Sequence, residues 1–171
     1  MITVQPFVKW AGGKRKLVPT ILSLIPPAFN RYIEPFLGGG AVAFTLKHTP
    51  MLLNDANAEL INAYEVVRDD LNALVQELDN HQTNHSESYY YEVRKQTPNT
   101  LTKLQQAARF IYLNKTAYNG LYRVNRFGNF NVPFGRYKNP RIYNRDNLEA
   151  VSLILKGARL YSLDYAVFLR E

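Results

Sequence analysis

A run of three glycines, Gly38-Gly39-Gly40, lies between a short apolar segment and a helix-forming stretch, and it is the first place where chemistry is expected. Such a turn lets the backbone approach a ligand closely and commonly holds a nucleotide-like molecule. It is not a P-loop, because no Gly-Lys-Ser/Thr follows, and Ala43 stands where the G-x-G-x-x-G pattern has its last glycine. A dinucleotide site of the permissive G-x-x-A kind stays open.

Asp55 is the acidic residue that can assist this turn. It follows a second apolar segment, fifteen residues after Gly40. A carboxylate at that place can accept hydrogen bonds from both hydroxyls of a ribose. The alternative is a plain glycine turn with Asp55 as the N-cap of the next helix. Spacing alone leaves both interpretations open.

A basic, aromatic segment is the second feature with chemical potential. From Arg94 to Arg145 there are eleven Lys or Arg and no Asp or Glu, whereas the rest of the chain has ten basic and fourteen acidic residues. The net charge of +7 therefore comes from this segment, which also holds nine aromatic residues and interleaved asparagines. Such residues neutralise phosphates, stack on bases and read base edges. We predict a nucleic-acid surface; the alternative is a core helix with a solvated basic face.

Several other kinds of site are not expected. The chain has no cysteine, which excludes disulfides, thiolate metal sites and a cysteine nucleophile. His48, His81 and His85 are too scattered for a zinc cluster, so no metal is predicted. Neither an export leader nor an apolar run long enough for a spanning helix is found, so we expect a cytoplasmic protein that does not enter a membrane.

Strand and helix patterns alternate along both ends of the chain and predict an α/β protein with a parallel sheet. Strands are expected at 31–36, 51–54 and 158–163. A long helix capped by Asp55 is expected through residue 78, and a capping box at Asp146 and Glu149 is expected to start a helix through residue 155. A further helix is expected over 101–118, a loop or helix start over 81–99, and a loop or hairpin over 121–144. The predicted units are 1–80, an insertion at 81–145, and a return to the sheet at 146–171.

Five blocks of motif residues follow one another along most of the chain. They are Phe-Val-Lys-Trp-Ala-Gly-Gly-Lys at 7–14, Glu-Pro-Phe-Leu-Gly-Gly-Gly-Ala-Val at 34–42, Leu-Asn-Asp-Ala-Asn at 53–57, Tyr-Leu-Asn-Lys-Thr-Ala-Tyr-Asn-Gly-Leu-Tyr-Arg at 112–123 and Phe-Asn-Val-Pro-Phe-Gly-Arg-Tyr at 130–137. In this order the blocks closely resemble the Dam family of DNA adenine-N6 methyltransferases. The resemblance implies a Rossmann-like, S-adenosylmethionine-dependent methyltransferase sheet with an inserted, mainly helical DNA-recognition domain.

The resemblance implies S-adenosylmethionine as cofactor. Asp55 matches the ribose-binding acid, Asp164 and Tyr165 match the pair that flanks the adenine, and Glu34 suits a ligand that has a sulfonium and no phosphate. Trp10 as a core residue and Asp164 as a strand-end cap remain alternatives. The complete predicted set is Trp10, Ala11, Gly12, Gly13, Lys14, Glu34, Phe36, Gly38, Gly40, Asp55, Asp164 and Tyr165.

The resemblance also implies roles on double-stranded DNA. Tyr118 and Asn119 would wedge into the duplex beside a flipped adenine. Base edges would be contacted by Leu121, Arg123 and Lys9. The predicted phosphate contacts are Arg94, Asn125, Asn131, Arg136 and Lys138. Family members with a similar 118–123 segment read GATC, which is the target expected here.

One family motif is absent from this chain. Adenine N6 is a poor nucleophile, and the family uses an Asp-Pro-Pro-Tyr motif to accept its hydrogens and stack on the base. The paired prolines here, Pro26-Pro27, follow Ile25 and precede Ala28. In the family the motif follows the third strand, near where this chain ends at Glu171. We therefore expect an N-terminal portion, inactive alone, without catalytic residues, and with strand 32–36 as an open edge that the rest of the enzyme or a second chain covers.

The predicted function is site-specific methylation of adenine N6, by base flipping and direct displacement without metal or covalent enzyme intermediate. One alternative is a non-catalytic DNA-binding module or a decayed remnant of a methyltransferase. A weaker one is a nucleotide-binding protein whose basic segment binds RNA.

Overall fold

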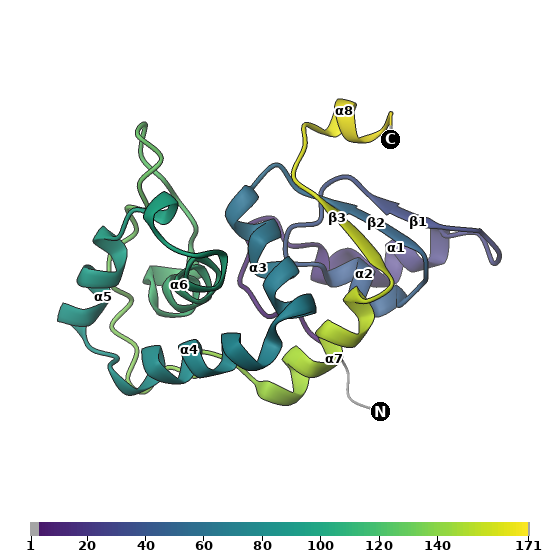
Figure 1. The fold of residues 1–171 in the computed structure, drawn as a ribbon. Helices are drawn as coiled ribbons and strands as arrows, with labels where there is room; N and C mark the ends of the chain where they lie inside the picture. Colours follow the sequence, from purple (N-terminus) through teal and green to yellow (C-terminus); the bar gives the residue numbers. More distant parts are fainter. Residues whose placement is uncertain (1–3, 171) are drawn as a thin grey trace.

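Three parallel strands at one side of the molecule carry the predicted site. The computed structural model describes residues 4–170; the first three residues and Glu171, which belong to the predicted end units, lie outside the described part. The strands are β1 (Tyr32–Glu34), β2 (Met51–Asn54) and β3 (Ala158–Tyr161), in the order β1-β2-β3 (Figure 1). Within residues 4–170, β1 pairs only with β2, and Ile33 lies opposite Leu52. The expected α/β class, strands and parallel pairing are confirmed.

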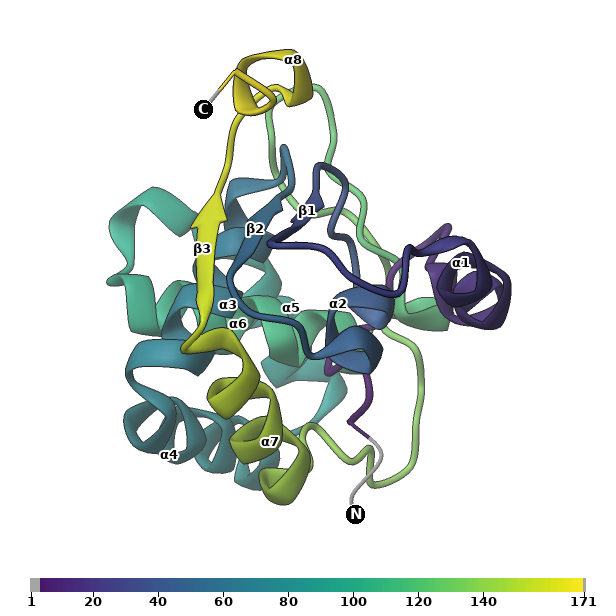
Figure 2. The ribbon, with the colours of Figure 1, turned by 90° about the vertical axis from the view of Figure 1, so that its right-hand side faces the viewer.

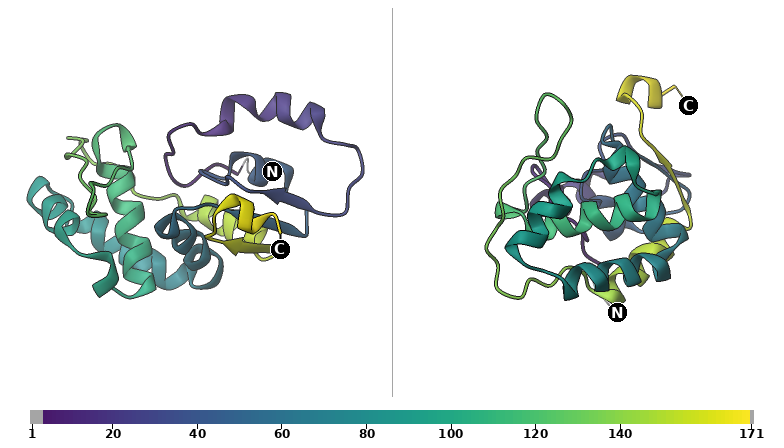
Figure 3. Two further views of the ribbon diagram at one scale, coloured as in Figure 1. Left: turned by 90° about the horizontal axis from the view of Figure 1, so that it is seen from above. Right: turned by 60° about the vertical axis from the view of Figure 1, so that its left-hand side comes forward.

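Helices form most of the chain between β2 and β3. Figure 1 shows α3 standing between the sheet and the helices α4, α5 and α6, and Figure 3 shows α1 apart from those three, on the side of the sheet. The α-helices are α1 (Val18–Leu24), α2 (Ala41–Leu46), α3 (Ala58–Asp69), α4 (Leu71–Thr83), α5 (Glu87–Lys95), α6 (Lys103–Thr116), α7 (Arg145–Leu155) and α8 (Tyr165–Phe168). Short 3₁₀ turns are η1 (Lys14–Leu17), η2 (Pro98–Thr100) and η3 (Tyr118–Gly120).

The helix that follows β2 differs from the prediction in its cap and its length. Asn57, and not Asp55, is the N-cap, because its side chain accepts a hydrogen bond from Leu60 N at 2.9 Å. The expected long helix is broken at Asp70, whose φ of −139° and ψ of 48° are not helical, so α3 and α4 are separate helices. Asp55 is therefore free of the capping role that we considered for it.

The later part of the chain contains a second misplaced cap. Asn144, and not Asp146, caps α7, because its Oδ1 accepts from Asn147 N at 3.2 Å. Residues 81–99 contain α5, which begins after a Ser86 cap. Residues 121–144 have no helix and take part in two isolated antiparallel bridges, Val124 with Phe130 and Phe134 with Ala117, which agrees with the expected loop or hairpin.

One buried cluster joins the sheet to the helices. Side chains of α3, such as Leu60 and Tyr64, are fully buried, and so are Leu53 of β2, Ile111 of α6 and Leu155 of α7. Burial of each large apolar side chain stabilises the fold by about 1.5–3 kcal/mol. The cluster therefore includes residues of all three predicted units.

The candidate site lies at the edge of the sheet that is formed by the carboxyl ends of the strands. Because the strands are parallel, these ends lie at one edge of the sheet, which is the usual position of ligand sites in α/β folds. In Figure 2 the hairpin of residues 121–131 and α8 both project beyond this edge. No helix within residues 4–170 has the length and apolar character needed to cross a membrane.

Candidate functional site

A pocket of about 240 Å³ lies beside the glycine turn. It is lined by the 10–14 loop, by residues 36–39 and by Asp55, which are far apart in sequence. Eight of the predicted cofactor residues therefore come together: Trp10, Ala11, Gly12, Gly13, Lys14, Phe36, Gly38 and Asp55. Leu37 and Gly39 complete the lining.

Asp55 fixes the glycine turn from the end of β2. Its Oδ2 accepts a hydrogen bond from Gly38 N at 2.8 Å, and its Oδ1 accepts one from Asn57 N at 3.0 Å. Each carboxylate oxygen keeps a further acceptor site for a ligand hydroxyl. Gly38 has a φ of +52°, and a Cβ there would lie 2.9 Å from Cδ1 of Trp10. Only glycine lets the turn and the indole pack this closely.

Glu34 is a buried carboxylate behind the pocket. Lys14 Nζ lies 3.0 Å from its Oε1 and also donates to the carbonyl of Phe36. Within the described part of the chain, neither oxygen of Glu34 accepts a hydrogen bond of normal geometry. Burial raises the pKa of Glu34, and the nearby Lys14 ammonium opposes this shift. A positively charged ligand nearby would favour the ionised form.

The other predicted cofactor residues do not line this pocket. Gly40 precedes α2, and its N–H donates to Leu37 O at 3.0 Å. Asp164 accepts from Ala166 N at 2.8 Å as the N-cap of α8, and not as a cap at the end of β3, which stops at Tyr161. The Tyr165 ring packs against the ring of Phe36 at 5.4 Å between centroids, and both are at least half exposed. Tyr165 thus adjoins the pocket through Phe36.

Two buried polar residues that the sequence analysis missed hold this edge together. Asn54 Nδ2 donates to Pro35 O and to Leu163 O, both at 3.0 Å, and its Oδ1 accepts from Leu163 N at 2.9 Å. The Tyr64 hydroxyl donates to Gly38 O at 2.8 Å. Asn54 could have been predicted from its position, because it is a polar residue at the end of an apolar strand.

A second group of predicted residues gathers around η3. Lys9 is joined to α6 by Asn114, whose Oδ1 accepts from Lys9 N and whose Nδ2 donates to Lys9 O, both at 2.7 Å. Asn114 Nδ2 also donates to Gly120 O at 3.3 Å. A Cβ on Gly120 would lie 2.1 Å from Lys9 Cδ, so the lysine stem crosses this glycine. The predicted base contact Lys9 therefore lies beside Tyr118 and Asn119. The buried Asn114 was not predicted.

Several side chains that we predict to contact DNA are exposed to solvent. Tyr118 is 53% exposed and Leu121 is 40% exposed. Asn119 projects from the same turn with a φ of +53°. Arg136 and Lys138 are exposed, and neither forms an ion pair with a carboxylate within residues 4–170.

Four other predicted DNA contacts have partners inside the protein. Arg123 Nε donates to Asn131 Oδ1 at 2.7 Å, and Asn125 Oδ1 accepts from two backbone N–H groups of its own turn. Arg94 Nη1 donates to Val132 O at 3.1 Å. These side chains shape the hairpin, and their contacts with DNA stay predictions.

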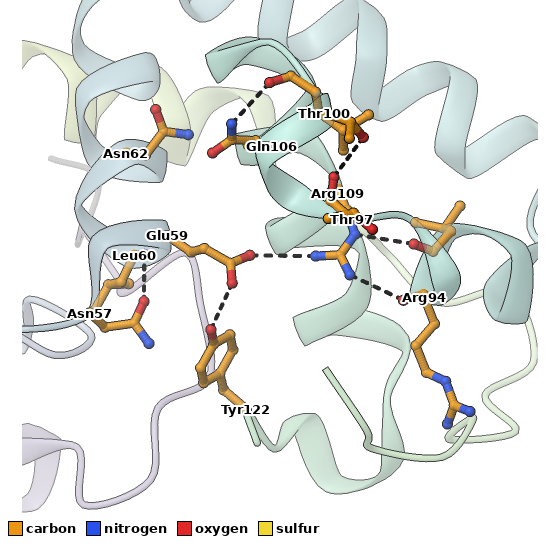
Figure 4. Close-up of polar contacts among 12 residues, drawn as sticks. Asn57, Glu59, Leu60, Asn62, Arg94, Thr97, Thr100, Gln106, Arg109 and Tyr122 are labelled. Atoms are coloured by element: carbon orange, nitrogen blue, oxygen red, sulfur yellow. Dashed lines mark hydrogen bonds and ion pairs between the residues drawn. The ribbon is translucent and has the colours of Figure 1, made fainter. Parts of the chain in front are cut away.

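Arg109 is the exception in the basic segment. It is 2% exposed, and its Nη1 lies 3.4 Å from Glu59 Oε2 (Figure 4). The other oxygen of Glu59 accepts from the Tyr122 hydroxyl at 2.9 Å. Tyr122 stacks on Trp10, with 5.5 Å between centroids. Burial lowers the pKa of Arg109, while burial and the adjacent Glu59 raise the pKa of Tyr122. The apolar stripe around Arg109 was the only signal that it faces the core.

Residues 4–170 contain no group of three His, Asp or Glu side chains arranged to hold a metal ion. The sites described above are therefore built from backbone groups, aromatic rings, carboxylates and basic side chains.

The chain is similar in sequence to a known family of DNA methyltransferases. The family model of the D12 class N6 adenine-specific DNA methyltransferases matches residues 10–171. The type II methyltransferase M1.LlaDCHI of Lactococcus lactis subsp. cremoris is 40% identical over 99% of this chain and 62% of its own length. M.MjaIII of Methanocaldococcus jannaschii is 39% identical over 96% of this chain and 63% of its own length.

The DNA adenine methylase of Escherichia coli (strain K12) is 39% identical over 80% of this chain and 49% of its own length. The chain thus spans between about half and 63% of the length of these relatives. The family match covers nearly all of the chain, including the glycine turn, Asp55 and the η3 segment. This chain therefore belongs to the D12 class of N6 adenine-specific DNA methyltransferases.

Proposed function

We propose that the protein transfers a methyl group from S-adenosylmethionine to adenine N6 in double-stranded DNA, and that this chain provides the cofactor pocket and the DNA-recognition surface. The observation that carries the proposal is the convergence of eight predicted cofactor residues on one pocket at the carboxyl end of the sheet. The names of the relatives, which include DNA adenine methylases, support the reaction.

The chemistry of the pocket fits S-adenosylmethionine better than a dinucleotide. Asp55 can accept from ribose hydroxyls, and the exposed Phe36 and Tyr165 rings offer an apolar surface for adenine. The buried Glu34 carboxylate favours the positive sulfonium and ammonium groups. Asp55, which lines the pocket, would repel a pyrophosphate, whereas Lys14 compensates the charge of Glu34. When bound, S-adenosylmethionine supplies the activated methyl group.

The surface around η3 fits duplex DNA. Tyr118 and Asn119 can enter the base stack, while Lys9, Leu121 and Arg123 lie within the same local region as candidates for reading base edges. Arg136 and Lys138 are free to neutralise phosphates. We propose GATC as the target sequence, on the resemblance of residues 118–123 to GATC-reading relatives.

Calorimetric titration with S-adenosylmethionine and with S-adenosylhomocysteine tests the pocket. Asp55→Ala is expected to weaken binding by about tenfold or more, since a hydrogen bond to a charged group contributes about 1.5–3 kcal/mol. Affinity for duplex DNA, measured without cofactor, should stay unchanged. Glu92→Gln, which removes an exposed carboxylate of α5, is the control. Unchanged cofactor affinity in Asp55→Ala would remove Asp55 from the site.

Fluorescence anisotropy with a GATC duplex, a shuffled duplex and an RNA duplex separates the alternatives. Preference for the GATC duplex together with cofactor binding supports the proposal. DNA binding without cofactor binding would favour a non-catalytic DNA-binding module. Equal binding to RNA would favour the nucleotide-binding alternative.

A further inference from the structure

The polar chain of Arg109, Glu59, Tyr122 and Trp10, here called the Glu59 chain, connects the two proposed sites. At one end Trp10 lines the pocket and packs on Gly38. In the middle Tyr122 lies between Leu121 and Arg123, the two predicted base contacts of the hairpin. At the other end Arg109 donates to Val93 O at 3.1 Å and to Arg94 O at 3.2 Å, which are in the last turn of α5.

We propose that Glu59 and Tyr122 are positioning residues that couple the cofactor pocket to the DNA-reading segment. In this proposal, a ligand beside Trp10 restrains the indole, the indole restrains the Tyr122 ring, and the Tyr122 hydroxyl on Glu59 keeps residues 121–123 in their reading position. The inference rests on the proposed function of both sites.

The directions of the contacts support coupling. Trp10 and Tyr122 stack with an interplanar angle of 28°, so a tilt of one ring displaces the other. Glu59 divides its two oxygens between Tyr122 and Arg109, as Figure 4 shows. The same short segment holds Asp55, which anchors the glycine turn. The short segment of residues 55–59, which ends in the first turn of α3, therefore contacts both sites.

A purely stabilising role explains these contacts less well. The Arg109 side chain is 2% exposed and that of Glu59 is 19% exposed, so both charges lose most of their hydration. A buried ion pair is often no more stable than apolar side chains of similar volume. What it provides is a defined geometry for each partner, which a coupling element needs.

The test uses the single tryptophan of the chain, because emission excited at a wavelength that the twelve tyrosines do not absorb reports on Trp10 alone. Affinity for a GATC duplex is measured with and without sinefungin, a non-transferring analogue of the cofactor. Wild type is expected to bind DNA at least about fivefold more tightly with the analogue, the lower end of ordinary coupling. Two variants should bring the ratio of DNA affinities with and without sinefungin towards one. They are Tyr122→Phe, which keeps the ring and removes the hydroxyl, and Glu59→Gln.

Separate affinities distinguish the possible outcomes. In both variants the affinity for sinefungin alone is expected to change by less than about threefold, and the Trp10 emission change caused by DNA should be lost. Tyr143→Phe, which removes a hydroxyl bonded to Asp79 away from the pocket, should behave as wild type. Thermal melts check that each variant is folded.

The inference is wrong, while the proposed function stands, in either of two cases. In the first, wild type binds both ligands but sinefungin does not change its DNA affinity. In the second, both variants keep the increase in DNA affinity that sinefungin causes in wild type. If wild type binds neither ligand, the proposed function fails and the inference fails with it.

Discussion

The glycine-turn pocket and the hairpin of residues 121–131 are held in shape by different kinds of contact. The turn is fixed by groups distant in sequence: the partly buried Asp55 and the buried Tyr64 hold Gly38, and the buried Asn54 joins the segments after β1 and β3. The hairpin is held by exposed neighbours, such as Arg123 with Asn131. Local opening is easiest where backbone and polar bonds are exposed and few apolar contacts exist. We therefore expect the pocket to be rigid and the hairpin to change shape more easily.

Asn114→Ala is expected to produce the largest effect. The buried amide satisfies Lys9 N, Lys9 O and Gly120 O, and its loss leaves these groups without their partner. Each unsatisfied buried group costs about 1–3 kcal/mol, so the free energy of unfolding should fall by about 3 kcal/mol or more. Urea denaturation measures it. Asn125→Ala, in the exposed hairpin, should change stability far less; an equal loss would contradict the contrast between the regions.

Acid is expected to weaken the helices that support the hairpin. Burial lowers the pKa of His81 from 6.5 to about 4, and its ring stacks on Tyr112 of α6. The unfolded chain binds this proton first, so the stabilisation present above pH 6.5 is lost as the pH falls towards 4, by at most about 3 kcal/mol.

Denaturation between pH 7 and 4 measures the loss, and hydrogen exchange locates it in α4 and α6. In His81→Phe, the free energy of unfolding should depend less steeply on pH between 7 and 4. A slope that does not change would show that His81 is not the titrating group.

Alanine substitutions at two glycines with positive φ can distinguish backbone strain from a steric clash of the added Cβ. Gly38 and Gly128 have φ of +52° and +78°, but only the Cβ at Gly38 would meet another atom within 4 Å, Trp10 Cδ1. Both variants should lose about 1–2 kcal/mol of stability from the backbone conformation. Only Gly38→Ala should weaken binding of S-adenosylmethionine, by about tenfold, as Trp10 is displaced. Equal cofactor affinities in the two variants would argue that the wall of the pocket is adaptable.

Substitutions in the DNA surface should give the smallest and most selective effects. Arg123→Ala is expected to lower discrimination between GATC and shuffled duplexes by about tenfold, which corresponds to one lost base contact. Arg136→Ala should weaken binding to both duplexes alike and reduce the salt dependence by about one phosphate contact. Because Arg123 also holds Asn131, the variant Asn131→Ala is needed as a control for hairpin shape. Equal losses on both duplexes for Arg123→Ala would contradict its assignment as a base contact.

The strands and the glycine turn could be predicted because short apolar segments and turn glycines are local signals. The motifs around Lys9, Gly38, Asp55 and Asn119 also indicated which segments would meet. Eight of the predicted residues line one pocket, and their role in binding the cofactor stays a prediction. Which side chain would cap a helix was less certain, because Asp55 and Asn57, or Asp146 and Asn144, are all good caps at neighbouring positions.

Interactions between distant residues could not be predicted. Arg109 resembled its basic neighbours, and only the packing of α6 against α3 shows that it faces Glu59. Arg123 and Asn131 were assigned separate DNA roles, but the hairpin brings them together. Partner choice depends on three-dimensional proximity, which one sequence does not contain.

The pairing of β2 with β3 has a consequence for how the chain folds. Met51 lies beside Ala158 in the sheet, so the whole helical segment from α3 to α7 separates two neighbouring strands. Closing so long a loop in an unfolded chain is entropically unfavourable and slows folding. During synthesis, helices α3 to α6 leave the ribosome before β3 and can associate first. Strand β3 then joins a surface that the helices have already organised, so the order of synthesis aids correct assembly.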